Sequence, residues 1–134
     1  MDIETELTES FSTAGTVQSF KNPAPNGSTK GKAGAKWQVV EFADFRCPHC
    51  REAAHFTTEL IKALGDKVEV TFKHYPLQGL EPSVVAAEAA EAAGAQGKFW
   101  QFHDIMFAHQ EALTRDDLVR YAGELKLDVK RFTK

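Results

Sequence analysis

Residues 38–50 read QVVEFADFRCPHC, and this stretch decides the fold that we expect for the chain. The segment 39–42 is β-branched or aromatic apart from Glu41, which predicts a buried strand. Pro48 suits the first turn of a helix, where its missing N–H costs nothing. We therefore expect Cys47 at the N-terminus of a helix that follows directly after a strand.

The flanking segments predict a strand–helix–strand unit. Apolar residues recur with a helical period through residues 48–64, and Gly65 is suited to end that helix. Residues 68–75 then alternate between apolar and polar side chains, as in a strand. A helix between two strands predicts a right-handed βαβ unit whose strands are parallel.

The chain becomes helical after the second strand. Pro82 opens an Ala-rich helix, and residues 98–109 carry an aromatic stripe that is typical of a core helix. Thr114 and Asp117 have nearly the spacing of a capping box at the start of a further helix. We expect a helical subdomain over about residues 81–132.

Residues 1–36 are expected to form an N-terminal extension or linker, with the domain itself at 37–134. Turn-forming Asn, Pro, Gly and Ser fill residues 22–28. The lysines that follow are expected to continue a solvated loop rather than to form a basic binding patch; they are Lys30, Lys32 and Lys36.

The composition is that of one soluble globular domain. Of the 134 residues, 43% are hydrophobic and 26% are charged. The formal net charge of −3 gives no reason to expect nucleic acid as a partner, and no uncharged stretch is long enough to span a bilayer. The acidic N-terminus lacks the basic and apolar regions of a secretory signal. We therefore expect an intracellular protein or a mature or excised domain.

The chain has two cysteines, and both lie in the CPHC motif. A disulfide across so short a loop adds little stability through chain entropy, so redox chemistry explains the pair better. Thiol–disulfide exchange needs a thiolate, and a helix N-terminus favours the anionic sulfur of Cys47. His49 can be cationic or donate a hydrogen bond to that sulfur. Cys50, one turn into the helix, is then the buried resolving thiol.

Other interpretations of these residues remain open. CxxC can be half of a zinc site, although no second CxxC is present and the five histidines lack the usual spacing beside it. Two buried structural thiols are a further alternative. Glu41 lies opposite Val40 and Phe42 in the alternation of the strand. It can therefore be a buried acid that relays protons to Cys50, or a residue on an exposed face.

Taken together, these residues resemble the active-site region of the DsbA-like thiol–disulfide oxidoreductases of the thioredoxin superfamily. The resemblance covers about residues 37–132 and includes FKHYPL at 72–77 and GKFW at 97–100.

The resemblance also implies roles for the residues of the motif. Cys47 corresponds to the attacking cysteine, Cys50 to the resolving cysteine, and His49 to the residue that stabilises the thiolate. Glu41 corresponds to the buried acid. The Pro48–His49 dipeptide between the cysteines goes with oxidising members of the family.

One part of the family pattern is missing from this sequence. In the family, a cis-proline loop, a β-hairpin and a final helix follow the helical insertion, whereas this sequence stops at Lys134. Its prolines outside the motif, namely Pro23, Pro25, Pro76 and Pro82, do not stand in that context. We therefore expect a fragment, a truncated product, or a chain completed by strand exchange, as in a homodimer.

The fold class that we predict is α/β: a thioredoxin-like βαβ core with an inserted or appended helical subdomain, incomplete at its C-terminus. The predicted function is disulfide exchange with protein thiols, acting as oxidant, with a separate redox partner and with neither cofactor nor metal. The family implies a periplasmic or other extracytoplasmic location. The alternative is a non-catalytic binding or dimerisation module whose CxxC is vestigial.

Overall fold

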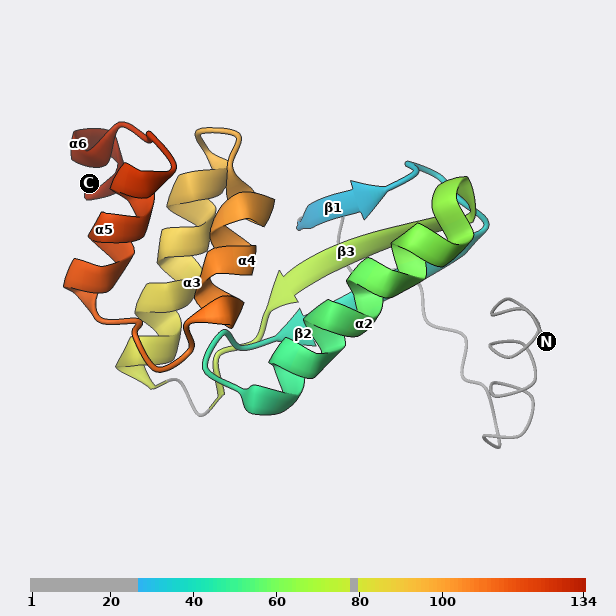
Figure 1. Ribbon diagram of the computed structural model, residues 1–134, viewed down its shortest axis with the longest axis horizontal. Coiled ribbons are helices and arrows are strands. Elements are labelled where there is room, and N and C mark those ends of the chain that lie inside the picture. The colour runs from blue at the N-terminus through green and yellow to red at the C-terminus, as the bar shows by residue number, and fades with distance from the viewer. Residues whose placement is uncertain (1–26, 78–79) are drawn as a thin grey trace.

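The computed structural model describes residues 27–77 and 80–134. A three-stranded sheet and one long helix form one side of the molecule, and the remaining helices group at the end of the sheet where β3 ends (Figure 1). The elements are β1 (Ser28–Gly31), β2 (Trp37–Ala43), α2 (Pro48–Leu64), the 3-10 turn η1 (Gly65–Lys67), β3 (Val68–His74), α3 (Glu81–Gly94), α4 (Phe99–Ala108), α5 (Arg115–Glu124) and α6 (Val129–Phe132).

The predicted βαβ unit is confirmed in its parallel pairing. The strand order is β1-β3-β2, and β2 runs parallel to β3 from the Trp37–Val68 pair to the Ala43–His74 pair. Helix α2 connects the two strands, as the sequence pattern predicts. Within the described part of the chain, β2 therefore forms one edge of the sheet.

The prediction of a continuous loop before residue 37 is wrong for Ser28–Gly31. These residues form β1, which pairs antiparallel with β3. Trp100 of α4 fixes this strand from the side, because its Nε1 donates a hydrogen bond to the carbonyl oxygen of Thr29 at 2.9 Å. The expected extension over residues 1–26 lies outside the described residues.

Helix α2 begins and ends where the sequence predicts. Pro48 occupies its first turn, and Gly65 follows its last residue with φ of 56°, a conformation that favours glycine. The face of α2 toward the sheet buries Leu60 and Leu64 against Val68 and Val70 of β3. This small core fixes the helix across the parallel pair.

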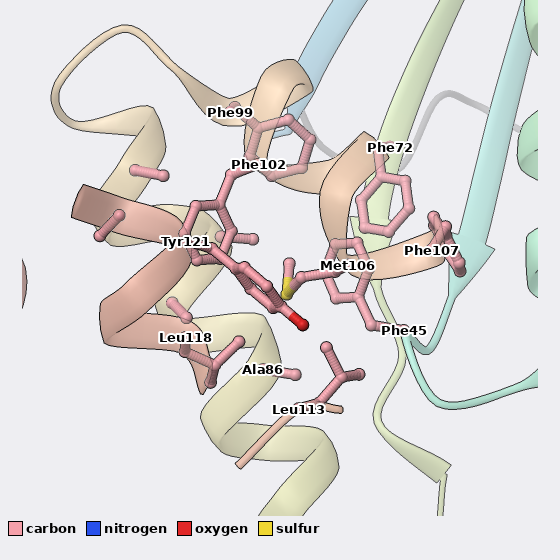
Figure 2. Packing of buried hydrophobic residues seen from close by; sticks show 14 of the residues in the cluster. Phe45, Phe72, Ala86, Phe99, Phe102, Met106, Phe107, Leu113, Leu118 and Tyr121 are labelled. Atoms are coloured by element: carbon pink, nitrogen blue, oxygen red, sulfur yellow. The ribbon is translucent and has the colours of Figure 1, made fainter. Parts of the chain in front are cut away.

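A second, larger core joins the sheet to the helices α3–α6 (Figure 2). Phe45, from the turn after β2, is 1% exposed and stacks on Phe72 of β3 with ring centroids 5.3 Å apart. Its ring also contacts Phe107 of α4, with ring centroids 4.9 Å apart. The turn that leads to Cys47 is therefore anchored in the core between the sheet and the helices.

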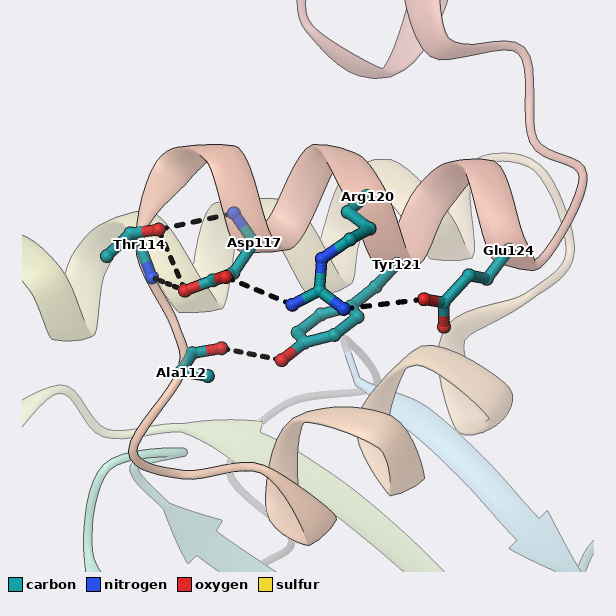
Figure 3. Close-up of polar contacts among 6 residues, drawn as sticks. All are labelled: Ala112, Thr114, Asp117, Arg120, Tyr121 and Glu124. Carbon is teal, nitrogen blue, oxygen red and sulfur yellow. Dashed lines mark hydrogen bonds and ion pairs between the residues drawn. The ribbon is translucent and has the colours of Figure 1, made fainter.

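The predicted capping box opens α5 (Figure 3). The hydroxyl oxygen of Thr114 accepts the N–H of Asp117 at 3.2 Å, and the N–H of Thr114 donates to Oδ2 of Asp117 at 3.1 Å. Tyr121 of the same helix donates its hydroxyl hydrogen to the carbonyl oxygen of Ala112 at 2.8 Å, which holds the preceding loop against α5. Among the described residues, no helix combines the length and hydrophobicity that crossing a bilayer requires.

We predict that Thr114→Ala lowers the free energy of unfolding by about 1 kcal/mol, because it removes the oxygen that caps the first turn of α5. Urea denaturation followed by circular dichroism measures this change. Thr114→Ser keeps the accepting oxygen and should stay close to the wild-type value. Equal stability of the Ala variant and the wild type would contradict this account of the cap.

Candidate functional site

The CPHC motif lies at the N-terminus of α2, where the sequence places it. Cys47 is the N-cap residue, with an extended backbone at φ −82° and ψ 122°. Its carbonyl oxygen accepts the N–H groups of Cys50 at 3.1 Å and Arg51 at 3.3 Å, which start the helix. No acidic side chain stands in the first turn of α2. The positive end of the helix dipole is therefore available to a negatively charged sulfur at Cys47.

Both cysteines are free thiols and half-buried. Burial raises the pKa of the Cys50 thiol, and its neighbours Cys47 and Glu41 raise it further. A backbone hydrogen bond from Asp44 acts in the opposite direction and does not cancel the effect. Cys50 therefore retains its proton more strongly than an exposed thiol does.

The imidazole of His49 points into solvent. Its side chain is 91% exposed, and its Nδ1 lies 4.0 Å from Oε2 of Glu52, one turn further along α2. His49 is thus adjacent to both cysteines along the helix, with a ring that is open to an approaching molecule.

Glu41 is buried, so the exposed alternative for this residue is wrong. It lies on β2 with 8% of its surface exposed, and neither carboxyl oxygen has a hydrogen-bond partner within the described residues. Burial raises its pKa, and the positive charge of Lys30 opposes that shift. The structure thus holds an acid with a raised pKa close enough to Cys50 to affect the ionisation of that thiol.

Lys30 is a residue of this region that the sequence analysis assigned to a solvated loop. Its Nζ lies 4.7 Å from the ring centre of Trp100 and 3.4 Å from Oγ1 of Thr58. Burial lowers the pKa of Lys30, while the nearby carboxylates Asp104 and Glu41 favour its charged form. Lys30 reaches this region because β1 pairs with β3, and the sequence of β1 gives little indication of that pairing.

Asp44 is a further residue of this region that the sequence analysis missed. Asp44 is 4% exposed and accepts the N–H of Arg46 on Oδ1 and the N–H of Leu77 on Oδ2, both at 2.8 Å. It therefore ties the turn before Cys47 to the segment that follows β3. An Asp that bonds the backbone two residues further on is a known turn signal, so this residue could have been found from the sequence.

Three other histidines differ in their burial. His103 is 1% exposed, its Nδ1 lies 2.8 Å from Oδ1 of Asp104, and burial lowers its pKa. His74 bonds Glu91 through Nε2 at 2.7 Å, and His55 is exposed. Across residues 27–77 and 80–134, no group of three or more His, Cys, Asp or Glu side chains is arranged to hold a metal ion.

Comparison with known proteins identifies relatives of two kinds. The family model described as thioredoxin matches residues 24–133. A thioredoxin-like oxidoreductase from Silicibacter pomeroyi is 33% identical with a TM-score of 0.74, over 82% of this chain and 62% of that protein. The oxidised BdbD of Bacillus subtilis is 28% identical with a TM-score of 0.69, over 79% of this chain and 63% of that protein.

The curated relatives are much longer proteins of a different kind. The Na(+)/H(+) antiporter NhaA 3 of Salinispora tropica is 45% identical over 104 residues, and the antiporter NhaA of Herminiimonas arsenicoxydans is 40% identical over 103 residues. Each match covers 77% of this chain but 16% of the antiporter. The chain therefore spans about one sixth of the length of these relatives.

Replacement of Glu41 by Gln should change the pH dependence of stability. Because the pKa of Glu41 is raised, the folded protein keeps this proton at pH values where the unfolded chain, with a pKa near 4.5, has released it. The wild-type free energy of unfolding therefore falls as pH rises from that value through the raised pKa, by at most about 1.4 kcal/mol per pH unit. The Gln variant lacks this slope.

Urea denaturation of both proteins at a series of pH values measures the difference. We expect the advantage of Glu41→Gln over the wild type to grow with pH across this window and then to become constant. Parallel stability curves for the two proteins would show that Glu41 titrates as an exposed acid.

Proposed function

The chain belongs to the thioredoxin family, and on that premise we propose that it exchanges disulfides with protein thiols through Cys47 and Cys50. One observation carries the proposal: Cys47 occupies the N-cap position of α2, and burial raises the pKa of Cys50, one turn further along the helix. Disulfide exchange needs a nucleophilic thiolate, which the helix N-terminus favours at Cys47, and a second thiol with which that sulfur forms the disulfide. The similarity to the Silicibacter pomeroyi oxidoreductase supports the same chemistry.

In the oxidising direction, a substrate thiolate attacks the Cys47 sulfur of the Cys47–Cys50 disulfide. The bond between the two cysteines breaks, Cys50 leaves with the electron pair and takes up a proton, and a mixed disulfide joins Cys47 to the substrate. The second substrate thiolate then attacks the substrate sulfur of the mixed disulfide, and Cys47 leaves as a thiolate. Two electrons have passed from the substrate to the chain, which a separate redox partner must reoxidise.

The remaining residues of the site have supporting roles in this scheme. Glu41, whose pKa is raised by burial, relays a proton to the departing Cys50 sulfur. Pro48 fixes the first turn of α2 and so the position of Cys47 at its end. His49 approaches the Cys47 thiolate by rotation of its exposed side chain and stabilises the negative charge.

The direction of exchange in this proposal is oxidation of the substrate. A helix N-terminus and a histidine that stabilise the Cys47 thiolate favour the reduced form of the pair, and a disulfide whose reduced form is stabilised is a stronger oxidant. Such an oxidant works where protein disulfides persist, so we place the site outside the cytoplasm.

Replacement of either cysteine tests the chemistry, and each variant retains a single thiol because the chain has two cysteines. We expect Cys47→Ser to reduce oxidation of a dithiol peptide to the uncatalysed rate. Reduced Cys50→Ser should attack a peptide disulfide and accumulate as a mixed disulfide that mass spectrometry detects at Cys47. Wild-type activity of Cys47→Ser would contradict the attacking role of Cys47, whereas an inactive wild type would instead support a non-catalytic binding module.

A second function is favoured by the similarity to the antiporters. The 45% identity to NhaA 3 of Salinispora tropica exceeds the identity to the Silicibacter pomeroyi oxidoreductase. In this candidate function, the thioredoxin unit is attached to a sodium–proton antiporter and couples the redox state of its cysteines to the transporter.

An antibody against residues 80–134 tests this attachment in membranes of the source cells. A band of antiporter size in the membrane fraction is the expected result for this candidate. A band that corresponds to 134 residues, with none of antiporter size, would contradict it.

The edge of the sheet supports one further element of the proposal, the pairing of two copies of the chain. Within the described residues β2 has a partner along one side, and Phe42 of this strand is 55% exposed. An edge strand with an exposed apolar side chain is a site for strand addition, in this case by a strand exchanged within a homodimer. Light scattering that gives the mass of one chain at all concentrations would contradict such pairing.

A further inference from the structure

Gln110 connects the helices to the cysteine site. It lies between α4 and α5, is half-buried, and is distant in sequence from the motif. Its side-chain Nε2 donates hydrogen bonds to the carbonyl oxygens of Phe45 and Cys47, both at 2.8 Å. A glutamine amide has two N–H donors, so these two bonds use its full donating capacity.

The two accepting carbonyl groups lie in the turn between β2 and α2, which ends at Cys47. The N–H of Cys47 donates to the carbonyl oxygen of Asp44 at 3.0 Å, which closes this turn. The carbonyl group of Cys47 belongs to the peptide unit that joins Cys47 to Pro48. The same oxygen accepts the first hydrogen bonds of α2, from Cys50 and Arg51. Gln110 therefore holds the peptide plane that relates Cys47 to the start of the helix.

We infer that Gln110 is a positioning residue for Cys47. By fixing this peptide plane, it keeps the Cys47 sulfur at the positive end of α2, where the thiolate is favoured. It bonds main-chain oxygens, so it acts through the backbone and not as a catalytic group. The inference rests on the proposed function and adds to it that the helical part of the chain sets the reactivity of the attacking cysteine.

A second glutamine provides a matched control for the structural effect of this contact. Gln96, between α3 and α4, is also half-buried and also makes two hydrogen bonds to the main chain. Its Nε2 donates to the carbonyl oxygen of Asp128 at 3.1 Å, and its Oε1 accepts the N–H of Asp128 at 2.8 Å. The contact joins two loops of the helical part and involves no residue of the motif.

The experiment compares Gln110→Met with Gln96→Met in the whole chain. Methionine has a similar length and removes the amide, so each variant loses two hydrogen bonds to the main chain. Urea denaturation gives the stability, and labelling of the reduced chain with iodoacetamide across a pH series gives the reactivity of Cys47 by peptide mass spectrometry. Oxidation of a dithiol peptide gives the exchange rate.

We expect both variants to lose stability, and we expect only Gln110→Met to change the reactivity of Cys47. Its rate of Cys47 labelling near neutral pH should fall about tenfold, the scale of a lost helix-terminus interaction, and its pH profile should shift toward alkaline values. An unchanged labelling profile and exchange rate in folded Gln110→Met would overturn the inference and leave Gln110 with a structural role alone.

A shorter amide keeps the test decisive if Gln110→Met does not fold. Gln110→Asn retains the two donors one methylene further from the carbonyl groups, and the same slower labelling is expected. Wild-type labelling by folded Gln110→Asn would again overturn the inference. An active wild type with an unaffected Gln110 variant refutes the positioning role alone, whereas an inactive wild type refutes the proposed function.

Discussion

The burial of Phe45 is the interaction on which the rest of the structure depends. This side chain belongs to the turn between β2 and α2, yet it packs against Phe72 of the sheet and Phe107 of α4. The two parts of the molecule therefore share a core at the point where the chain leads to Cys47. Because well-packed interiors tolerate little displacement, the position of the cysteine is linked to that of both parts.

Hydrogen bonds add a second constraint around the same turn. Asp44 bonds the turn to the segment after β3, and Gln110 bonds it to the loop after α4. Contacts from three parts of the chain thus converge on a few residues before the helix. A turn held in this way keeps Cys47 in one place relative to the end of α2, as a reactive side chain requires.

Burial shifts the pKa of two ionisable side chains of the small sheet, Glu41 and Lys30. An isolated carboxyl group without hydrogen-bond partners is costly in an apolar interior, and Glu41 responds with a raised pKa. Lys30, from the strand on the far side of β3, brings the charge that limits this shift. A raised pKa keeps the proton on a carboxyl group up to a higher pH than on an exposed one, and the proposed proton relay from Glu41 to Cys50 uses this property.

Features encoded locally could be predicted from the sequence, and features that depend on distant contacts could not. The signals for strand β3, for the proline that opens α2 and for the capping box of α5 each lie within a few residues, and the structure confirms these features. Strand β1 escaped prediction because its polar and glycine residues form a strand only when β3 and Trp100 are beside them. Gln110 escaped because its partners lie 65 and 63 residues away.

The most direct test of the account is the transfer of one disulfide between the purified chain and a peptide that contains two thiols. The oxidised chain and the reduced peptide are mixed in equal amounts without any other oxidant, and both are followed by mass spectrometry. The account predicts that one peptide disulfide forms for each Cys47–Cys50 disulfide that is lost, through a mixed disulfide at Cys47. A chain that keeps its disulfide while the peptide stays reduced would contradict it.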